Sequence, residues 1–254
     1  MPKCEFSETQ FSFCYTFEFA NDYTPWSILP FFPSTYLEGQ PGYGYDVRIS
    51  GNLYFQYKVP YYVTVRRTDN KRQWDAHNQP FYRCKLNTDD EQHELLHDLK
   101  EPTNEVYYAT PEFNSNLEIS RHYLNRAIVE NTMLFPIEDL PPYGSGLHSM
   151  TYTQGAGFGM MFSEPVEVKR RSANELREYI TSSDRDSSLF EEAKRIQEII
   201  NRYIPIQQID IKYPESNSEL VNMTKNILLS YFGILWVPIL SNEQKELSIL
   251  IKGK

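Results

Sequence analysis

The stretch from Gly42 to Val59 constrains the fold of this chain more than any other. Two runs rich in β-forming residues flank the tripeptide Ser50-Gly51-Asn52, and this pattern is typical of a tight turn between two strands. We therefore predict a β-hairpin. Because side chains alternate along a strand, Gln56 and Lys58 are expected to share one face. Asp46 precedes Gln56 by ten positions, so the hairpin would bring its carboxylate against that pair.

A carboxylate, an amide oxygen and a lysine at one place suit the Mg²⁺-assisted hydrolysis of a phosphodiester bond. The oxygen atoms of Asp46 and Gln56 can hold the hard metal ion. The ammonium group of Lys58 can orient the attacking water and offset the charge that develops. A structural interpretation of the same residues stays open: Asp46 caps a turn, and the other two side chains line the solvated face of a sheet.

The order Asp, spacer, Gln-x-Lys resembles the PD-(D/E)xK nuclease superfamily as found in small bacterial proteins. The resemblance covers roughly residues 5 to 112. The resemblance implies that Asp46 is a metal ligand, that Gln56 replaces the commoner carboxylate, and that Lys58 is the active-site lysine. A neutral amide binds Mg²⁺ or Mn²⁺ more weakly than a carboxylate does, so a further acidic ligand is expected. Glu8, in the first predicted helix, is the first candidate and would join the catalytic set; Glu38 is the second.

The resemblance also implies a fold. The hairpin, a helix over residues 87–100 and a strand over 106–110 follow the order strand, strand, helix, strand of the superfamily's core. The expected class is α/β, with a mixed β-sheet flanked by helices in a restriction-endonuclease-like core and a helical C-terminal region. We predict a nuclease-like domain over residues 1–170 and a helical region over 171–254 packed on it.

Periodicity and capping residues predict further elements along the chain. Ser7 is expected to cap a helix that ends near Ala20. Other helices are predicted over residues 117–130, 173–204 and 216–236, and extended segments over 28–33, 61–67, 81–86, 133–137, 148–153 and 158–168. The apolar residues 227–240 are too few to span a bilayer and indicate a buried helix or strand.

Charge is unevenly distributed in this chain of 254 residues, whose net charge is −9. Residues 58–85 carry seven basic side chains and only two aspartates. This segment can follow a nucleic-acid backbone, and a solvated polar loop is the alternative. The candidate phosphate contacts are Arg66, Arg67, Lys71 and Arg72.

Three cysteines without metal-site spacing and an N-terminus unlike a signal peptide favour a cytoplasmic protein that does not contact membranes. Gln92 and His93, on the helix that follows the site, are secondary candidates for a contact with the metal or the phosphate. His93 and His97 have the spacing of a zinc pair, but no third ligand pattern supports zinc.

The sequence therefore predicts a Mg²⁺-dependent DNA endonuclease, with RNA as the alternative substrate and a role in defence against foreign DNA. A homodimer and a partner protein of a defence complex both stay open. The rival prediction is a catalytically silent protein of the same fold that binds nucleic acid or a protein partner. The acidic net charge and the glutamine in place of a carboxylate favour this rival.

Overall fold

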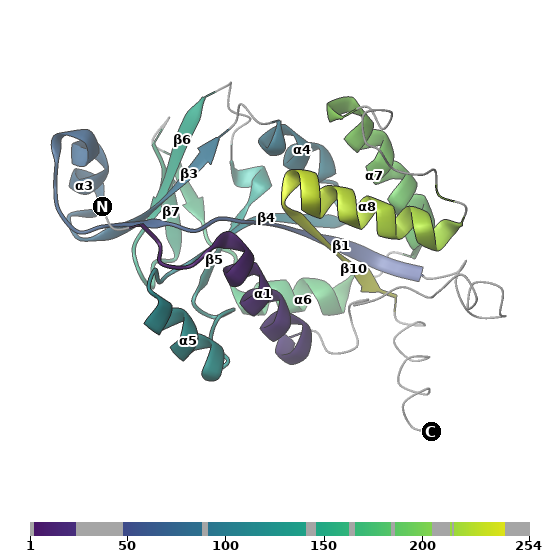
Figure 1. The fold of residues 1–254 in the computed structure, drawn as a ribbon, viewed down its shortest axis with the longest axis horizontal. Coiled ribbons are helices and arrows are strands. Elements are labelled where there is room, and N and C mark those ends of the chain that lie inside the picture. The colour runs from purple at the N-terminus through teal and green to yellow at the C-terminus, as the bar shows by residue number, and fades with distance from the viewer. Residues whose placement is uncertain are drawn as a thin grey trace. The chain divides into compact units, whose positions relative to one another are not determined.

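The computed structural model describes residues 3–23, 48–87, 91–140, 146–162, 166–183, 186–204, 214 and 216–241. Its fold is α/β, with a mixed sheet flanked by helices, as the sequence predicts (Figure 1). Asp46, Glu38 and the predicted extended segment 28–33 lie outside the described residues.

The chain forms two compact units, each assembled from separated segments. Unit 1 consists of Met1–Tyr23, Gln56–His93 and Tyr107–Leu176, and unit 2 of Thr24–Phe55, Glu94–Val106 and Arg177–Lys254. Elements that cross a unit boundary are β1 (Arg48–Tyr57), α4 (Gln92–Leu99), β4 (Asn104–Pro111) and α6 (Ala173–Ser182). The division at residue 170 into a nuclease-like domain and a helical region stays a prediction.

Unit 1 contains an antiparallel sheet in the order β2-β3-β6-β7-β8. Its strands are β2 (Tyr61–Val63), β3 (Phe81–Asn87), β6 (Leu147–Tyr152), β7 (Phe158–Met161) and β8 (Val166–Lys169). The connection between β2 and β3 carries the short helices η2 (Thr68–Asn70) and α3 (Lys71–His77). The basic segment is therefore partly helical, and not only a loop.

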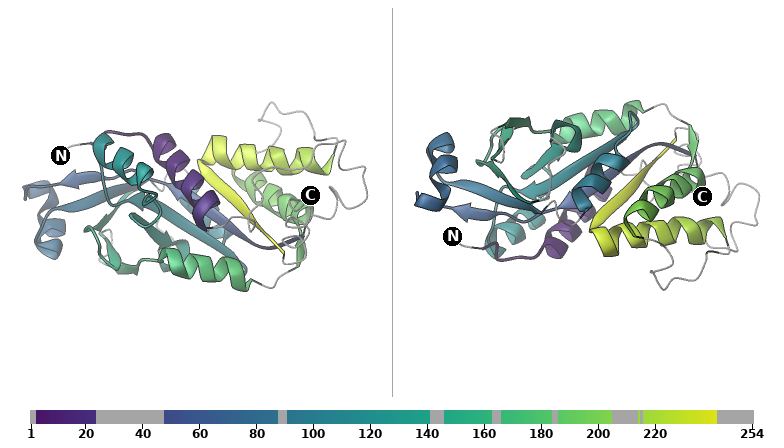
Figure 2. Two further views of the ribbon diagram at one scale, coloured as in Figure 1. Left: turned by 90° about the horizontal axis from the view of Figure 1, so that it is seen from below. Right: turned by 90° about the horizontal axis from the view of Figure 1, so that it is seen from above.

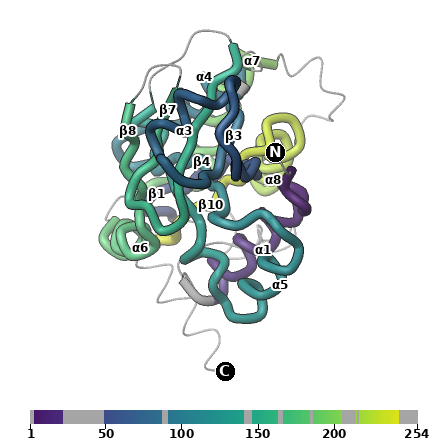
Figure 3. Tube along the Cα trace, turned by 90° about the vertical axis from the view of Figure 1, so that its left-hand side faces the viewer, coloured from purple at the N-terminus to yellow at the C-terminus, as the bar shows by residue number. Residues whose placement is uncertain are grey.

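Helix α1 (Glu8–Glu18) of unit 1 begins where the sequence predicts, since the Ser7 hydroxyl accepts a hydrogen bond from the Gln10 N–H at 3.1 Å. A π-helical turn, η1 (Phe19–Tyr23), follows it. The Glu18 carboxylate is buried and accepts hydrogen bonds from the backbone N–H groups of Ile128 and Val129. These bonds connect α1 to the segment after α5 (Asn116–Leu124), and the two helices are neighbours in Figure 3.

Strand β5 (Thr132–Pro136) pairs antiparallel with the end of β4, and η3 (Ile137–Asp139) follows it.

In unit 2 the strands β10 (Ile234–Leu240), β1 and β4 are neighbours in that order, and β9 (Ser187–Ser188) pairs with the start of β1. Helices α7 (Leu189–Tyr203) and α8 (Asn217–Phe232) lie side by side (Figure 2). Gly233 ends α8 with φ at 64°, a left-handed conformation that glycine adopts without steric cost. The apolar run 227–240 is thus divided between a helix and a buried strand.

The predicted hairpin is wrong: β1 runs without a turn through Ser50-Gly51-Asn52. The buried Asn52 side chain accepts a hydrogen bond from the Trp236 indole N–H at 2.8 Å and donates one to Asn104 at 3.0 Å. These long-range partners satisfy the polar groups that otherwise favour a turn. At Gly51 the hydroxyl of Tyr179 would lie 2.7 Å from a Cβ atom, so this position has no room for a side chain.

Two smaller differences concern helices. The predicted helix over residues 173–204 is divided into α6 and α7, and the helix predicted over 117–130 ends at Leu124. Within the described part of the chain, we find no helix with the length and apolar character needed to cross a membrane.

Candidate functional site

Gln56, the predicted amide ligand, lies near the end of β1, and only 2% of its surface is exposed. Its Nε2 atom donates to the Tyr57 carbonyl at 3.3 Å, which fixes the orientation of the amide, because the flipped amide would oppose two oxygen atoms. The Oε1 atom is buried and has no hydrogen-bond partner among the described residues. A buried acceptor without a partner costs about 1–3 kcal/mol. Such groups are rare in folded proteins, and each calls for a physical reason.

Lys58 follows the last residue of β1 and is half-buried. Its backbone N–H donates to the Ala109 carbonyl at 3.0 Å, so the extended conformation continues beside β4 as far as this residue. The Lys58 ammonium donates to Gln92 Oε1, at the start of α4, at 3.1 Å. Tyr57, in contrast, contacts α1, where its hydroxyl lies 3.1 Å from that of Thr16. Neighbouring side chains therefore contact different helices, as strand alternation predicts.

His93, the other candidate on α4, is buried. It is not among the residues that line a pocket beside Lys58, which is described in the next paragraph. Its Nδ1 atom lies 3.1 Å from the Tyr108 hydroxyl, and the two rings are stacked with centroids 6.0 Å apart. Burial raises the pKa of Tyr108, so that hydroxyl stays protonated near neutral pH. Gln92, and not His93, is the residue of this helix that holds the lysine.

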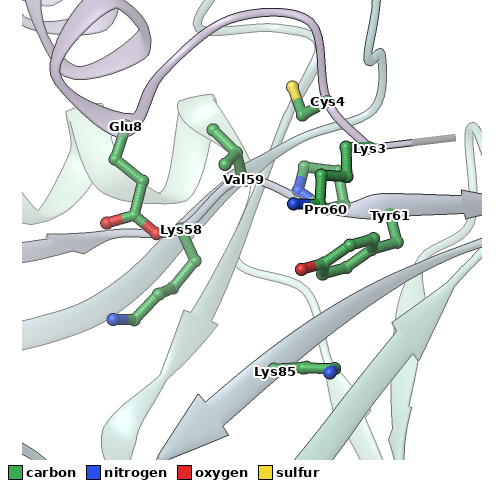
Figure 4. Close-up of a pocket in the computed structure, with 8 residues that line it drawn as sticks. All are labelled: Lys3, Cys4, Glu8, Lys58, Val59, Pro60, Tyr61 and Lys85. Atoms are coloured by element: carbon green, nitrogen blue, oxygen red, sulfur yellow. The ribbon is translucent and has the colours of Figure 1, made fainter.

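A pocket of about 280 Å³ lies beside Lys58, within unit 1 (Figure 4). It brings together Lys58 and Glu8, two residues that the sequence analysis assigned to one site. Figure 4 shows the Glu8 side chain directed from the first turn of α1 toward Lys58. The residues that line the pocket are Lys3, Cys4, Glu8, Lys58, Val59, Pro60, Tyr61 and Lys85.

The pocket is predominantly positive, because three lysines oppose the single carboxylate of Glu8. Desolvation raises the pKa of the Cys4 thiol to about 11, so the thiol is neutral at physiological pH and adds no negative charge. The Lys85 ammonium lies 5.5 Å from the centroid of the Tyr61 ring, in a cation–π contact.

The cysteine behind this site is Cys84, on β3. Burial raises the pKa of its thiol to about 12, and the charge of Glu8 acts in the same direction while that of Lys58 opposes it. Its Sγ atom lies 2.9 Å from the Thr110 hydroxyl, which in turn lies 2.7 Å from the Tyr152 hydroxyl. The network is neutral at physiological pH and buried, so it supports the site and offers no nucleophile.

Some of the predicted site stays untested. Asp46 and Glu38 lie outside the described residues, and with the hairpin absent the register argument that placed Asp46 against Gln56 no longer holds. In the part of the chain that the structure describes, three or more His, Cys, Asp or Glu residues nowhere gather to form a metal site. Lys3 is a pocket residue that the sequence does not predict, because no local pattern indicates that the N-terminal segment lies beside β2.

The four candidate phosphate contacts of the basic segment differ in how they are paired. Arg66 and Lys71 both bind Asp75, at 2.8 and 2.9 Å, and together they lower the pKa of that carboxyl to about 2. Arg67 and Arg72 are exposed, and no ion pair of their side chains is found among the described residues. Of the four candidates, Arg67 and Arg72 are therefore the two whose charge is not offset by a carboxylate among the described residues.

Comparisons of the chain with protein-family models, with curated protein sequences and with solved structures found no match. The function is accordingly inferred from the residues of the site.

Proposed function

We propose that this protein is a Mg²⁺-dependent DNA endonuclease of the PD-(D/E)xK type, which hydrolyses phosphodiester bonds. The observation that carries the proposal is the buried Oε1 atom of Gln56, which has no partner among the described residues and lies two positions before Lys58, the residue that directly follows β1. A metal ion bound at this oxygen would remove the cost of its burial. RNA is the alternative substrate. A role in defence against foreign DNA and a cytoplasmic location belong to the same proposal.

The donor atoms suit a hard divalent cation. Amide and carboxylate oxygens are the usual ligands of Mg²⁺ and Mn²⁺. Gln56 and Glu8 would supply one of each, although only Glu8 lines the pocket. Asp46 and Glu38 are the further carboxylates that the sequence offers. When bound, the cation would lower the pKa of a water molecule and neutralise charge on the phosphate.

Lys58 would stabilise the negative charge that develops on the phosphate oxygens. Gln92 is a positioning residue for it, since its amide oxygen holds the ammonium at 3.1 Å without neutralising its charge. The amide leaves the positive charge of Lys58 available to an anionic substrate, whereas a carboxylate at the same place would reduce it.

One observation favours the alternative, a nuclease-fold protein that binds nucleic acid or a protein partner without cleaving. β1 is continuous where a hairpin was expected, so no turn at Ser50-Gly51-Asn52 directs Asp46 toward Gln56. A site with one carboxylate and one neutral amide would bind Mg²⁺ weakly. Such a protein would still present its exposed basic residues to nucleic acid but would not hydrolyse it.

The decisive experiment measures the Mg²⁺-dependent and Mn²⁺-dependent cleavage of plasmid and linear DNA. We expect Lys58→Ala and Asp46→Ala each to abolish cleavage, with circular dichroism and melting temperature close to those of the parent. Lys169→Ala, which changes a lysine that is 81% exposed on β8, is the matched control and should cleave as the parent does. Cleavage that persists in both site variants, or a parent protein that never cleaves, would refute the proposal.

A further inference from the structure

The pocket beside Lys58 has two ends of different character. Figure 4 shows Glu8 and Lys58 at one end, and Lys3, Tyr61 and Lys85 at the other. Glu8 and Lys58 belong to the proposed hydrolytic site. The remaining three residues come from the N-terminal segment, β2 and β3, and the proposed reaction does not use them.

The end formed by Lys3, Tyr61 and Lys85 has the chemistry of a phosphate-binding site. Two ammonium groups can neutralise an anion as point charges, and a tyrosine hydroxyl can donate a hydrogen bond to one of its oxygen atoms. The carboxylate that would repel an anion stands at the opposite end. Because Lys3 and Lys85 are exposed, an extended polyanion can reach them.

We propose that this end of the pocket binds a phosphate group of the nucleic-acid backbone adjacent to the scissile phosphodiester. Lys3 and Lys85 supply the positive charge, and Tyr61 supplies a hydroxyl donor and a ring that holds the Lys85 ammonium. This subsite rests on the proposed function, since Lys58 marks the position of the scissile group. Arg67 and Arg72, the other exposed basic residues proposed to contact phosphates, do not line this pocket.

The volume and the lining of the whole pocket are compatible with a short stretch of nucleic-acid backbone. A volume of about 280 Å³ lies just below the usual range of ligand pockets, about 300–1,000 Å³. Val59 and Pro60 line the wall between the two ends and present apolar surface to a sugar ring. Because this end and Lys58 line the same pocket, a phosphate held at one end would help to determine which bond is presented at the other.

The test measures binding separately from cleavage. The fluorescence anisotropy of a labelled single-stranded DNA, and of the same sequence as a duplex, is recorded in EDTA over a series of salt concentrations. We expect Lys3→Gln combined with Lys85→Gln to reduce the slope of log K against log salt by about 1.4 for the single strand and about 1.8 for the duplex. Lys169→Gln, which removes one exposed lysine outside the pocket, should leave both slopes unchanged.

A second variant tests the subsite without changing charge. Tyr61→Phe keeps the ring beneath Lys85 and removes only the hydroxyl, and we expect severalfold weaker binding with the same salt slope. Unchanged slopes in the double lysine variant would overturn the inference. A parent protein that binds neither the single strand nor the duplex would also overturn it. The same holds if the double lysine variant shows weaker binding only when a mononucleotide is the probe.

Cleavage in Mg²⁺ distinguishes this inference from the function on which it rests. A parent protein that shows the lysine-dependent slope and no cleavage supports the subsite and refutes the endonuclease. A parent protein that cleaves, with a double variant that binds as tightly as the parent, overturns the subsite and leaves the endonuclease standing.

Discussion

Gln56→Met tests whether the buried amide oxygen serves a metal ion. The substitution nearly conserves the volume of the side chain, so the repacking cost should stay below about 1.5 kcal/mol. It removes an acceptor whose burial without a partner costs about 1–3 kcal/mol. It also removes the bond to the Tyr57 carbonyl at 3.3 Å, a contribution of about 0.5–1.5 kcal/mol. Because these contributions largely cancel, the free energy of unfolding of the metal-free variant should lie within about 1 kcal/mol of that of the parent.

The addition of Mg²⁺ should then separate the two proteins. At a concentration ten times the dissociation constant, a cation that binds only the folded state stabilises it by about 1.4 kcal/mol. For a chain of this length, that free energy raises the melting temperature by roughly 3–6 °C. The parent should show this shift in a thermal melt, and Gln56→Met should show a clearly smaller one.

The chain supplies a matched control for this experiment. Gln197, in α7 of unit 2, is also buried, and its Oε1 atom likewise lacks a partner among the described residues. Gln197→Met should therefore change the stability in metal-free buffer about as much as Gln56→Met does. It should still show the full increase in melting temperature when Mg²⁺ is added. The reasoning is refuted if Gln56→Met loses more than about 2 kcal/mol without metal, or if Mg²⁺ stabilises it as much as the parent.

Three further predictions concern other parts of the chain. Gly51→Ala should destabilise the fold by about 1–3 kcal/mol in denaturant titrations, because its Cβ would meet a hydroxyl at 2.7 Å. Gly157→Ala has open space around it and should be nearly neutral. Equal effects of the two substitutions would contradict a continuous β1. Neutralising Arg67 and Arg72 together should reduce the salt slope of duplex binding by about 1.8, and an unchanged slope would mean that the basic segment is only a solvated surface. The folded-state pKa of the Asp75 carboxyl is lowered to about 2. The carboxylate should therefore stabilise the fold above about pH 4, and this stability should be lost as the pH falls toward 2. An NMR titration in which Asp75 titrates near pH 4 would contradict its two ion pairs.

Local sequence determined much of the secondary structure around the site. Ser7 and the aromatic residues that follow it predict α1, because a capping hydroxyl and helical spacing act within one or two turns of chain. The alternation that directs Tyr57 to one helix and Lys58 to another also follows from the sequence, since it depends only on the geometry of a strand. The resemblance to a nuclease family, and not local sequence, named Glu8 as a partner of Lys58, and both residues line one pocket.

Tertiary structure decided the features that depend on partners distant in the sequence. Ser50-Gly51-Asn52 has the composition of a turn, yet it lies inside a strand because Trp236 and Asn104 satisfy the Asn52 side chain. No local pattern could reveal these bonds, because the indole that makes one of them is supplied from almost the other end of the chain. Lys3 reaches the pocket in the same way, through packing of the N-terminal segment against β2 and β3. Local propensity specifies which conformations a segment prefers, and only long-range contacts decide which of them is kept.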